Sequence, residues 1–107
     1  DALTLSGSTI GQRGQIVSYT LSAKQPNTVY GLLVSRQNNG TSIFGHPFDI
    51  GSPYQIVRTG TSDANGQAAI SFTIPMSVAS NTIVYVEGGA RNGAGVDDSN
   101  LLTLLIQ

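Results

Sequence analysis

The sequence predicts an all-β fold, an immunoglobulin-like antiparallel β-sandwich of about seven strands, and three observations predict it. Runs rich in β-branched and aromatic residues recur between breaks of Gly, Asn and Pro. The 107 residues include 13 Gly and 4 Pro, which fits a chain with many turns. No helical period of useful length appears, and residues 76–80 are too few for an ordinary helix. We therefore expect one sandwich domain over residues 1–107.

The first half of the chain supplies three expected strands. Leu3 and Leu5 alternate with polar residues over 2–6 and should point into the sandwich. Pro26 follows a second strand over 14–23, at a place where a missing amide costs nothing. A third strand over 28–36 leads into a long irregular connection, residues 37–53.

The second half supplies four more strands. Between strands over 54–59 and 67–75, Asp63-Ala64-Asn65-Gly66 is a strong turn signal, because Asn and Gly accept positive φ cheaply. Strands over 82–91 and 99–107 complete the set. We expect 2–6, 14–23 and 67–75 to face 28–36, 82–91 and 99–107, with 54–59 as a candidate fourth strand of the first sheet.

Composition narrows the classes of partner. Charged residues make up 10% of the chain, against roughly 25% in a typical soluble protein. A net charge of −1 argues against nucleic acid and against docking on an anionic membrane, and no run approaches the ~20 apolar residues of a membrane span. A weakly charged Ser-, Thr-, Asn- and Gln-rich surface favours self-association. Together with a start at Asp1, it predicts an extracellular, secreted or cell-surface protein.

Three strands are apolar on both faces, which predicts a surface that something covers. If Arg36, Glu87 and Gln107 point to solvent, strand alternation places one apolar patch on the outer face of the second sheet. A patch of this size is too large to leave exposed on a stable monomer. Its predicted members, taken as interface residues, are Tyr30, Leu32, Val34, Ile83, Tyr85, Leu101 and Leu105.

Two kinds of cover are open at this point. The connection 37–53 carries Ile43, Phe44, Phe48 and Ile50 and could fold back over the face. A neighbouring subunit in a homo-oligomer, or a domain of a parent protein, could cover it instead. Edge strands also offer unpaired amides to a neighbour, and residues 1–12 could act as a donated strand if they do not form the chain's own first strand.

Signals for chemistry are weak. His46 and Asp49 lie close in sequence and define a hydrolase alternative, but a single loop histidine is far more often structural. Asp63, Asp97 and Asp98 are weak candidate Ca²⁺ ligands, because their loops should gather at one end of a sandwich. The chain has no cysteine, which excludes disulfides and thiolate metal sites. We expect no enzyme activity, no catalytic residue and no cofactor.

A carbohydrate-binding or adhesion module is the alternative function. Phe44, Phe48 and Tyr54 crowd into or beside the connection 37–53, and neighbouring Asn and Gln could hydrogen-bond a sugar stacked on these rings. Packing of the connection onto the sheet is the plainer role for the same rings.

Several short motifs are informative beyond their local structure. The turn and strand at 61–68 and 72–75 resemble those of bacterial immunoglobulin-like domains. Segments 3–7, 47–51 and 99–101 resemble, more closely still, the secreted β-sandwich modules of planctomycetes and related bacteria. The resemblance implies a non-enzymatic extracellular module, often attached to a larger secreted protein, and it supplies no catalytic residues. We therefore expect a structural subunit of a filament, surface layer or coat.

Overall fold

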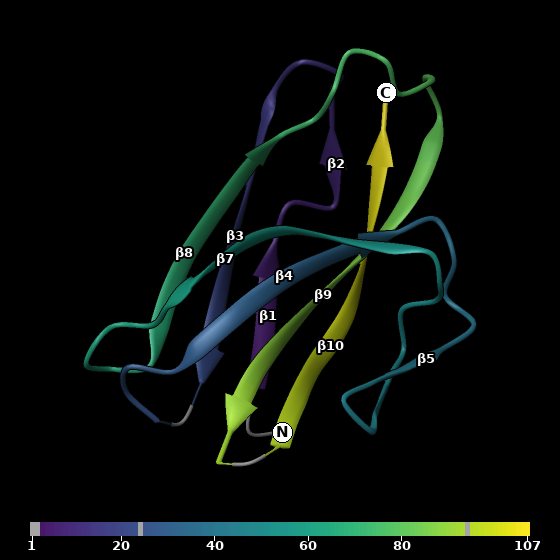
Figure 1. The fold of residues 1–107 in the computed structure, drawn as a ribbon. Helices are drawn as coiled ribbons and strands as arrows, with labels where there is room; N and C mark the ends of the chain where they lie inside the picture. Colours follow the sequence, from purple (N-terminus) through teal and green to yellow (C-terminus); the bar gives the residue numbers. More distant parts are fainter. Residues whose placement is uncertain (1–2, 24, 94) are drawn as a thin grey trace.

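The chain folds into two packed β-sheets with a small hairpin outside them (Figure 1). The computed structural model describes residues 3–23, 25–93 and 95–107. Within these ranges no helix is long and apolar enough to cross a membrane. The strands are β1 (Leu3–Gly7), β2 (Ile10–Gly11), β3 (Ile16–Ala23), β4 (Val29–Ser35), β5 (Thr41–Ile43), β6 (His46–Phe48), β7 (Tyr54–Thr61), β8 (Gln67–Thr73), β9 (Thr82–Asn92) and β10 (Gly95–Ile106).

The predicted fold class is confirmed: the structure is an immunoglobulin-like antiparallel β-sandwich. The seven expected strands correspond to β1, β3, β4, β7, β8, β9 and β10, with shifted ends; residue 2, the expected start of the first strand, lies outside the described residues. Three short strands were not expected, β2 and the pair β5–β6. Residues 97 and 98, expected in a loop, lie within β10.

The two sheets differ in width. One has the order β1-β3-β8 and the other β2-β10-β9-β4-β7. Assigning strand 54–59 to the first sheet was therefore wrong, because β7 pairs with β4 instead, with Tyr54 opposite Ser35. The Ser35 hydroxyl donates to the Pro53 carbonyl oxygen at 2.8 Å, which closes the connection beside the end of β4 and starts β7 there.

The main core lies between these sheets. Alternate residues of β1, β3 and β8 pack against Leu32, Val86 and Leu104 of the wider sheet, all of which are fully buried. The Asn100 side chain joins the sheets at their edge, because its amide accepts from the Leu5 N–H at 2.8 Å and donates to the Leu5 carbonyl at 2.9 Å. Asn100 lies where the register between β9 and β10 shifts, between Asp98 and Leu101.

The predicted orientation of β4 was wrong. Tyr30, Leu32 and Val34 pack into the main core rather than on the outer face. Arg36 indicated the wrong set of outward-facing residues on β4. It lies beyond the last residue of the strand, so its side chain can turn to solvent whatever the alternation of the strand. The outer face of β4 carries Leu33 instead.

The other four patch residues lie on the outer face of the wider sheet. Leu101 stands opposite Glu87 and Leu105 opposite Ile83, so each pair shares one face. Tyr85 and Leu101 are half-buried, whereas the Ile83 side chain is 47% exposed. The patch is therefore smaller than predicted.

This assignment of faces predicts different costs for two aliphatic truncations. Leu32→Ala should reduce the free energy of unfolding by about 2–5 kcal/mol, because it opens a cavity in the core. Ile83→Ala should cost less than about 1 kcal/mol, because half of that side chain is already in water. Urea unfolding of both variants measures the difference, and equal losses would mean that the faces are misassigned.

Candidate functional site

The connection 37–53, here called the covering segment, folds over the outer face of the wider sheet. It contains the β5–β6 hairpin, whose two-residue turn places both Phe44 and Gly45 at positive φ. Backbone hydrogen bonds from Gly40 to Asp49 and from Gly51 to Gln37 continue the hairpin towards its base. The segment is thus an ordered part of the fold.

A second apolar cluster lies under this segment. Phe48 and Ile50 are buried against Leu33, and the half-buried residues around them are Ile43, Tyr54, Tyr85, Val96 and Leu101. Gly89 leaves room for the Phe48 ring, because a Cβ there would come within 3.1 Å of two ring carbons. The chain's own segment therefore covers the centre of the outer face.

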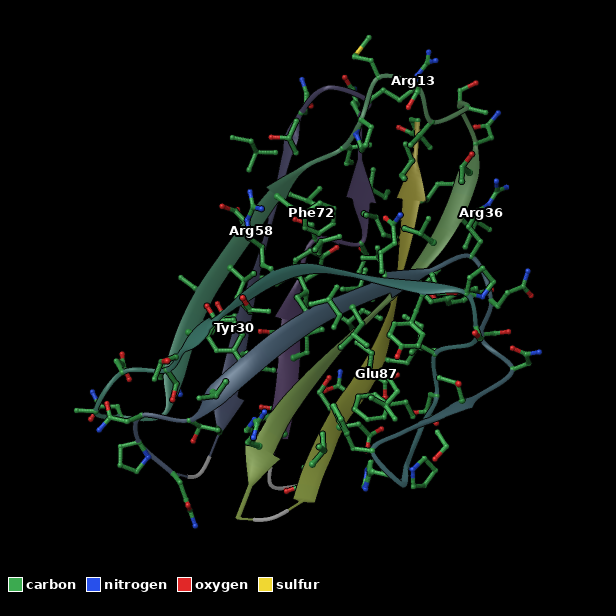
Figure 2. The ribbon with its side chains drawn as sticks, in the orientation of Figure 1. Arg13, Tyr30, Arg36, Arg58, Phe72 and Glu87 are labelled. Carbon is green, nitrogen blue, oxygen red and sulfur yellow. The ribbon has the colours of Figure 1, made fainter. Side chains whose placement is uncertain are left out.

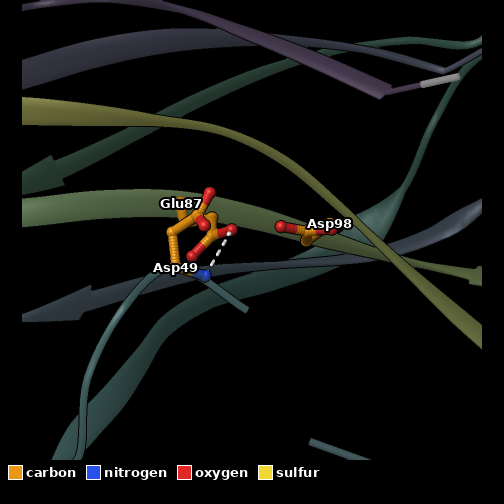
Figure 3. Close-up of side chains that lie close together, drawn as sticks. All are labelled: Asp49, Glu87 and Asp98. Carbon is orange, nitrogen blue, oxygen red and sulfur yellow. Dashed lines mark hydrogen bonds between the residues drawn. The ribbon is translucent and has the colours of Figure 1, made fainter. Parts of the chain in front are cut away.

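Glu87 anchors the segment. Its side chain is 0% exposed, although the sequence placed it in solvent. Its carboxyl group accepts a hydrogen bond from the Ile50 N–H at 2.8 Å. It accepts a second one from the Asp49 N–H at 3.2 Å (Figure 3). The prediction failed because Glu87 does point outward, but into backbone donors of the covering segment rather than into water.

Asp98 and His46 complete the polar contacts of this anchor. Asp98 lies on β10 opposite Gly89, and its carboxylate binds the Nε2 of His46 at 2.7 Å. Burial, together with hydrogen bonding to Asp98, raises the pKa of Glu87 to about 8. Burial also acts to raise the pKa of Asp98, but hydrogen bonds with Glu87 and His46 outweigh it and lower that pKa. At neutral pH a protonated Glu87 therefore faces an ionised Asp98.

The carboxyl groups do not gather as the sequence predicted. Among the described residues, ligand oxygens of Asp49, Glu87 and Asp98 lie within 4.8 Å of one another. Asp63 is not in this group, and its Oδ1 accepts from the N–H groups of Asn65 and Gln67, each at 2.9 Å. Asp97 lies on β10 opposite Ala90. Because both Glu87 oxygens accept backbone hydrogen bonds and Asp98 binds His46, the group is organised as a structural anchor.

The two other predicted sites are also rearranged. His46 contacts Asp98, whereas the Asp49 N–H donates to Glu87, so the described contacts do not pair the two residues named for the hydrolase alternative. Phe44 is 85% exposed at the hairpin tip, Phe48 is buried and Tyr54 is half-buried. These three rings do not form one open platform, because Phe48 packs inward against the sheet.

The structure reveals a groove that sequence reasoning missed. It lies between β7 and β8, which belong to different sheets, and has a volume of about 570 Å³. Side chains of the main core line it, among them Val34, Val57 and Phe72. The turn 62–66 joins β7 to β8, and the two strands run apart from it (Figure 1). Tyr54 and Pro75 are among the residues that line the groove. Sequence reasoning missed the groove because it made 54–59 a candidate strand of the first sheet, whereas β7 pairs with β4.

Both strands that border the groove are sheet edges. In the described residues β8 pairs with β3 and β7 pairs with β4, and each ends its sheet. The Ser71 carbonyl of β8 accepts a hydrogen bond from Arg58 of β7 at 3.1 Å, so the backbone groups of Ser71 point towards the groove side. Ala69 and Thr73, two residues away on either side, present theirs in the same direction.

The groove is positively charged at its rim. Arg36 and Arg58 line it, and none of the described residues that line it is acidic. Figure 2 shows the two arginines on either side of Phe72. Within the described ranges neither guanidinium forms an ion pair, since the pair present there joins His46 and Asp98. Charge and apolar surface therefore meet at one unfilled opening.

Comparisons with known proteins support the fold. No protein-family model matches the chain, and no curated protein matches it. A solved structure with a similar fold is the PKD domain of an M14-like peptidase from a Thermoplasmatales archaeon, with a TM-score of 0.51 and 15% sequence identity. The match covers 97% of this chain and 91% of that one. At this identity the likeness concerns the fold alone.

The anchor predicts how stability depends on pH. The pKa of Glu87 rises from an ordinary 4.5 to about 8 on folding, so the folded state binds more protons than the unfolded state between these values. Stability should therefore be highest near pH 4.5 and fall as pH rises to 8, with a slope of at most about 1.4 kcal/mol per pH unit. Glu87→Gln keeps a donor and an acceptor at this position but does not ionise, and should remove the decline. Thermal melting of both proteins between pH 5 and 9 measures this, and an unchanged slope in the variant would contradict the assignment.

Proposed function

We propose that this chain is a non-catalytic extracellular module that associates with other proteins by accepting an extended strand in the groove between β7 and β8. The strand would come from a neighbouring subunit or from an adjacent domain of a parent protein. One observation carries the proposal: in the described residues the edge strand β8 borders an opening lined by core side chains. Apolar surface and unpaired backbone groups together are what an added β-strand satisfies.

This route replaces association through the outer sheet face. The covering segment already buries the centre of that face, so a partner would gain little from binding there. The groove is different, because Val34, Val57 and Phe72 are only partly buried although they pack against the main core. A strand in the groove would remove them from water at about 25 cal/mol for each Å² of apolar surface buried.

The extracellular, non-enzymatic setting has two supports. The motifs resemble secreted modules of planctomycetes and related bacteria, and low charge suits a protein that assembles with others. The archaeal PKD domain is itself part of a peptidase, and by analogy we propose that this chain serves as an accessory module or an assembly subunit of a filament, surface layer or coat. This analogy concerns architecture and carries no activity to the chain.

A proline on the groove edge should block strand addition without breaking the fold. Ser71→Pro removes an N–H that points towards the groove, whereas the ladder between β8 and β3 uses Ile70 and Phe72 on its other side. The probe is a soluble acetylated and amidated heptapeptide that alternates Thr and Val. Titration followed by ¹⁵N NMR should shift the amides of Ala69 and Thr73 in the native protein, and Ser71→Pro should weaken binding at least ten-fold.

Ser71→Thr is the matched control, because it changes the same residue and keeps the amide. It should bind the peptide as the native protein does, and spectra of both variants should show the native fold. If the peptide leaves the amides of β8 unchanged, or if the proline variant binds as well as the native protein, the proposed function is wrong.

A further inference from the structure

We infer that the groove between β7 and β8 selects an extended peptide that carries carboxylate groups beside its aliphatic residues. This inference rests on the proposed function and adds the chemistry of the partner. Two features of the groove bear on it: the hydrogen bond from Arg58 of β7 to the Ser71 carbonyl of β8, and the absence of acidic residues among the described residues of the lining.

Arg58 joins the two edge strands of the groove in the isolated chain. Its Nε donates to the Ser71 carbonyl at 3.1 Å, and one terminal nitrogen donates to the Val57 carbonyl at the same distance. Arg58 thereby occupies a carbonyl that an incoming strand would need. A charged side chain turned towards an edge is one way in which proteins prevent indiscriminate strand pairing. A strand that pairs with β8 must therefore first break the hydrogen bond between Arg58 and Ser71.

An acidic strand would displace the Arg58 side chain from the Ser71 carbonyl more easily than a neutral strand would. The hydrogen bonds of Arg58 to neutral carbonyls are exposed, so breaking them costs little. Once released, the guanidinium needs a new acceptor, and a carboxylate fits its planar fork with two parallel hydrogen bonds. A neutral strand would leave the released charge with water alone, whereas an acidic strand would pair with it.

Arg36 adds a second positive charge that favours a carboxylate-bearing occupant at the opening of the groove. It follows β4 directly and is exposed, and it lines the opening together with Pro53 and Tyr54. The acidic side chains Asp49, Glu87 and Asp98 gather instead under the covering segment on the outer face. An occupant with a carboxylate at either end would therefore meet an arginine and no opposing carboxylate from the groove lining.

The occupant is a peptide because of the edges that border the groove. β8 presents the backbone of Ala69, Ser71 and Thr73 on this side, and these groups need both donors and acceptors. An extended peptide supplies both at the spacing of a strand. A fatty acid would match the apolar lining and the arginines but would leave that row of backbone groups unpaired.

Two matched peptides test the inference. Both alternate Val and Thr over five central residues and are acetylated and amidated; one has Glu at each end and the other has Gln. The Glu peptide should bind the native protein about five-fold more tightly in 20 mM salt, the size expected for two partly exposed ion pairs. The preference should shrink towards one at 300 mM salt, because salt screens exposed charges.

Two arginine variants locate the preference. Arg58→Gln should abolish most of the discrimination between the peptides, whereas Arg13→Gln, which removes a charge outside the groove lining, should leave it unchanged. The comparison uses a ratio of two affinities for each variant, so a modest loss of stability does not affect it.

The outcomes separate this inference from the proposed function. Equal binding of both peptides, blocked by Ser71→Pro, would refute the acidic preference and leave strand acceptance standing. Binding of neither peptide would refute both. Binding of decanoate with the same dependence on Arg58, and of no peptide, would assign the groove to an acyl chain and overturn the inference.

Discussion

The pairing of β7 with β4 is the constraint on which the rest of the structure depends. A strand can complete only one of the two sheets, and the choice of β4 gives a sandwich of five strands against three. The narrower sheet is left with β8 as an edge, and the apolar residues that another strand would bury remain partly exposed in the groove. Closure of the connection at Ser35 and Pro53 fixes this choice, because it starts β7 beside the end of β4. The main-core side chains are therefore partly exposed in the groove because β7 joins the sheet of β4.

The same connection explains why the outer face does not play the part that the apolar strands first indicated. The covering segment between β4 and β7 buries Phe48 and Ile50, and Glu87 holds it by two backbone hydrogen bonds. Burying a carboxyl group is costly unless it is neutral or hydrogen-bonded, and Glu87 meets both conditions, because burial raises its pKa to about 8 and its oxygens have donors. The centre of one apolar face is thus covered within the chain. The groove lined by main-core side chains lies elsewhere, between β7 and β8.

Much of the fold could be predicted, because it is encoded locally. Alternation in 68–74 and the Asp63–Gly66 turn are short-range signals, and they placed β8 and its preceding turn correctly. The candidate site depended on longer-range facts. The assumption that Arg36 points outward gave the wrong face for β4, because Arg36 lies just past the end of the strand. Glu87 does point outward, but it is buried rather than in solvent, because its hydrogen-bond donors come from a segment distant in sequence. The groove could not be inferred at all, because it exists only through the sheet that β7 joins.

Hydrogen exchange at the β8 backbone tests the central claim, strand acceptance, most directly. In the isolated protein the amides of Ala69, Ser71 and Thr73 should exchange quickly, whereas those of Ile70 and Phe72 should be protected by pairing with β3. When the Glu-terminated peptide saturates the protein, the three exposed amides should become protected, because a new strand covers them. If Ala69, Ser71 and Thr73 stay unprotected in the saturated complex, β8 does not accept a strand and the account is wrong.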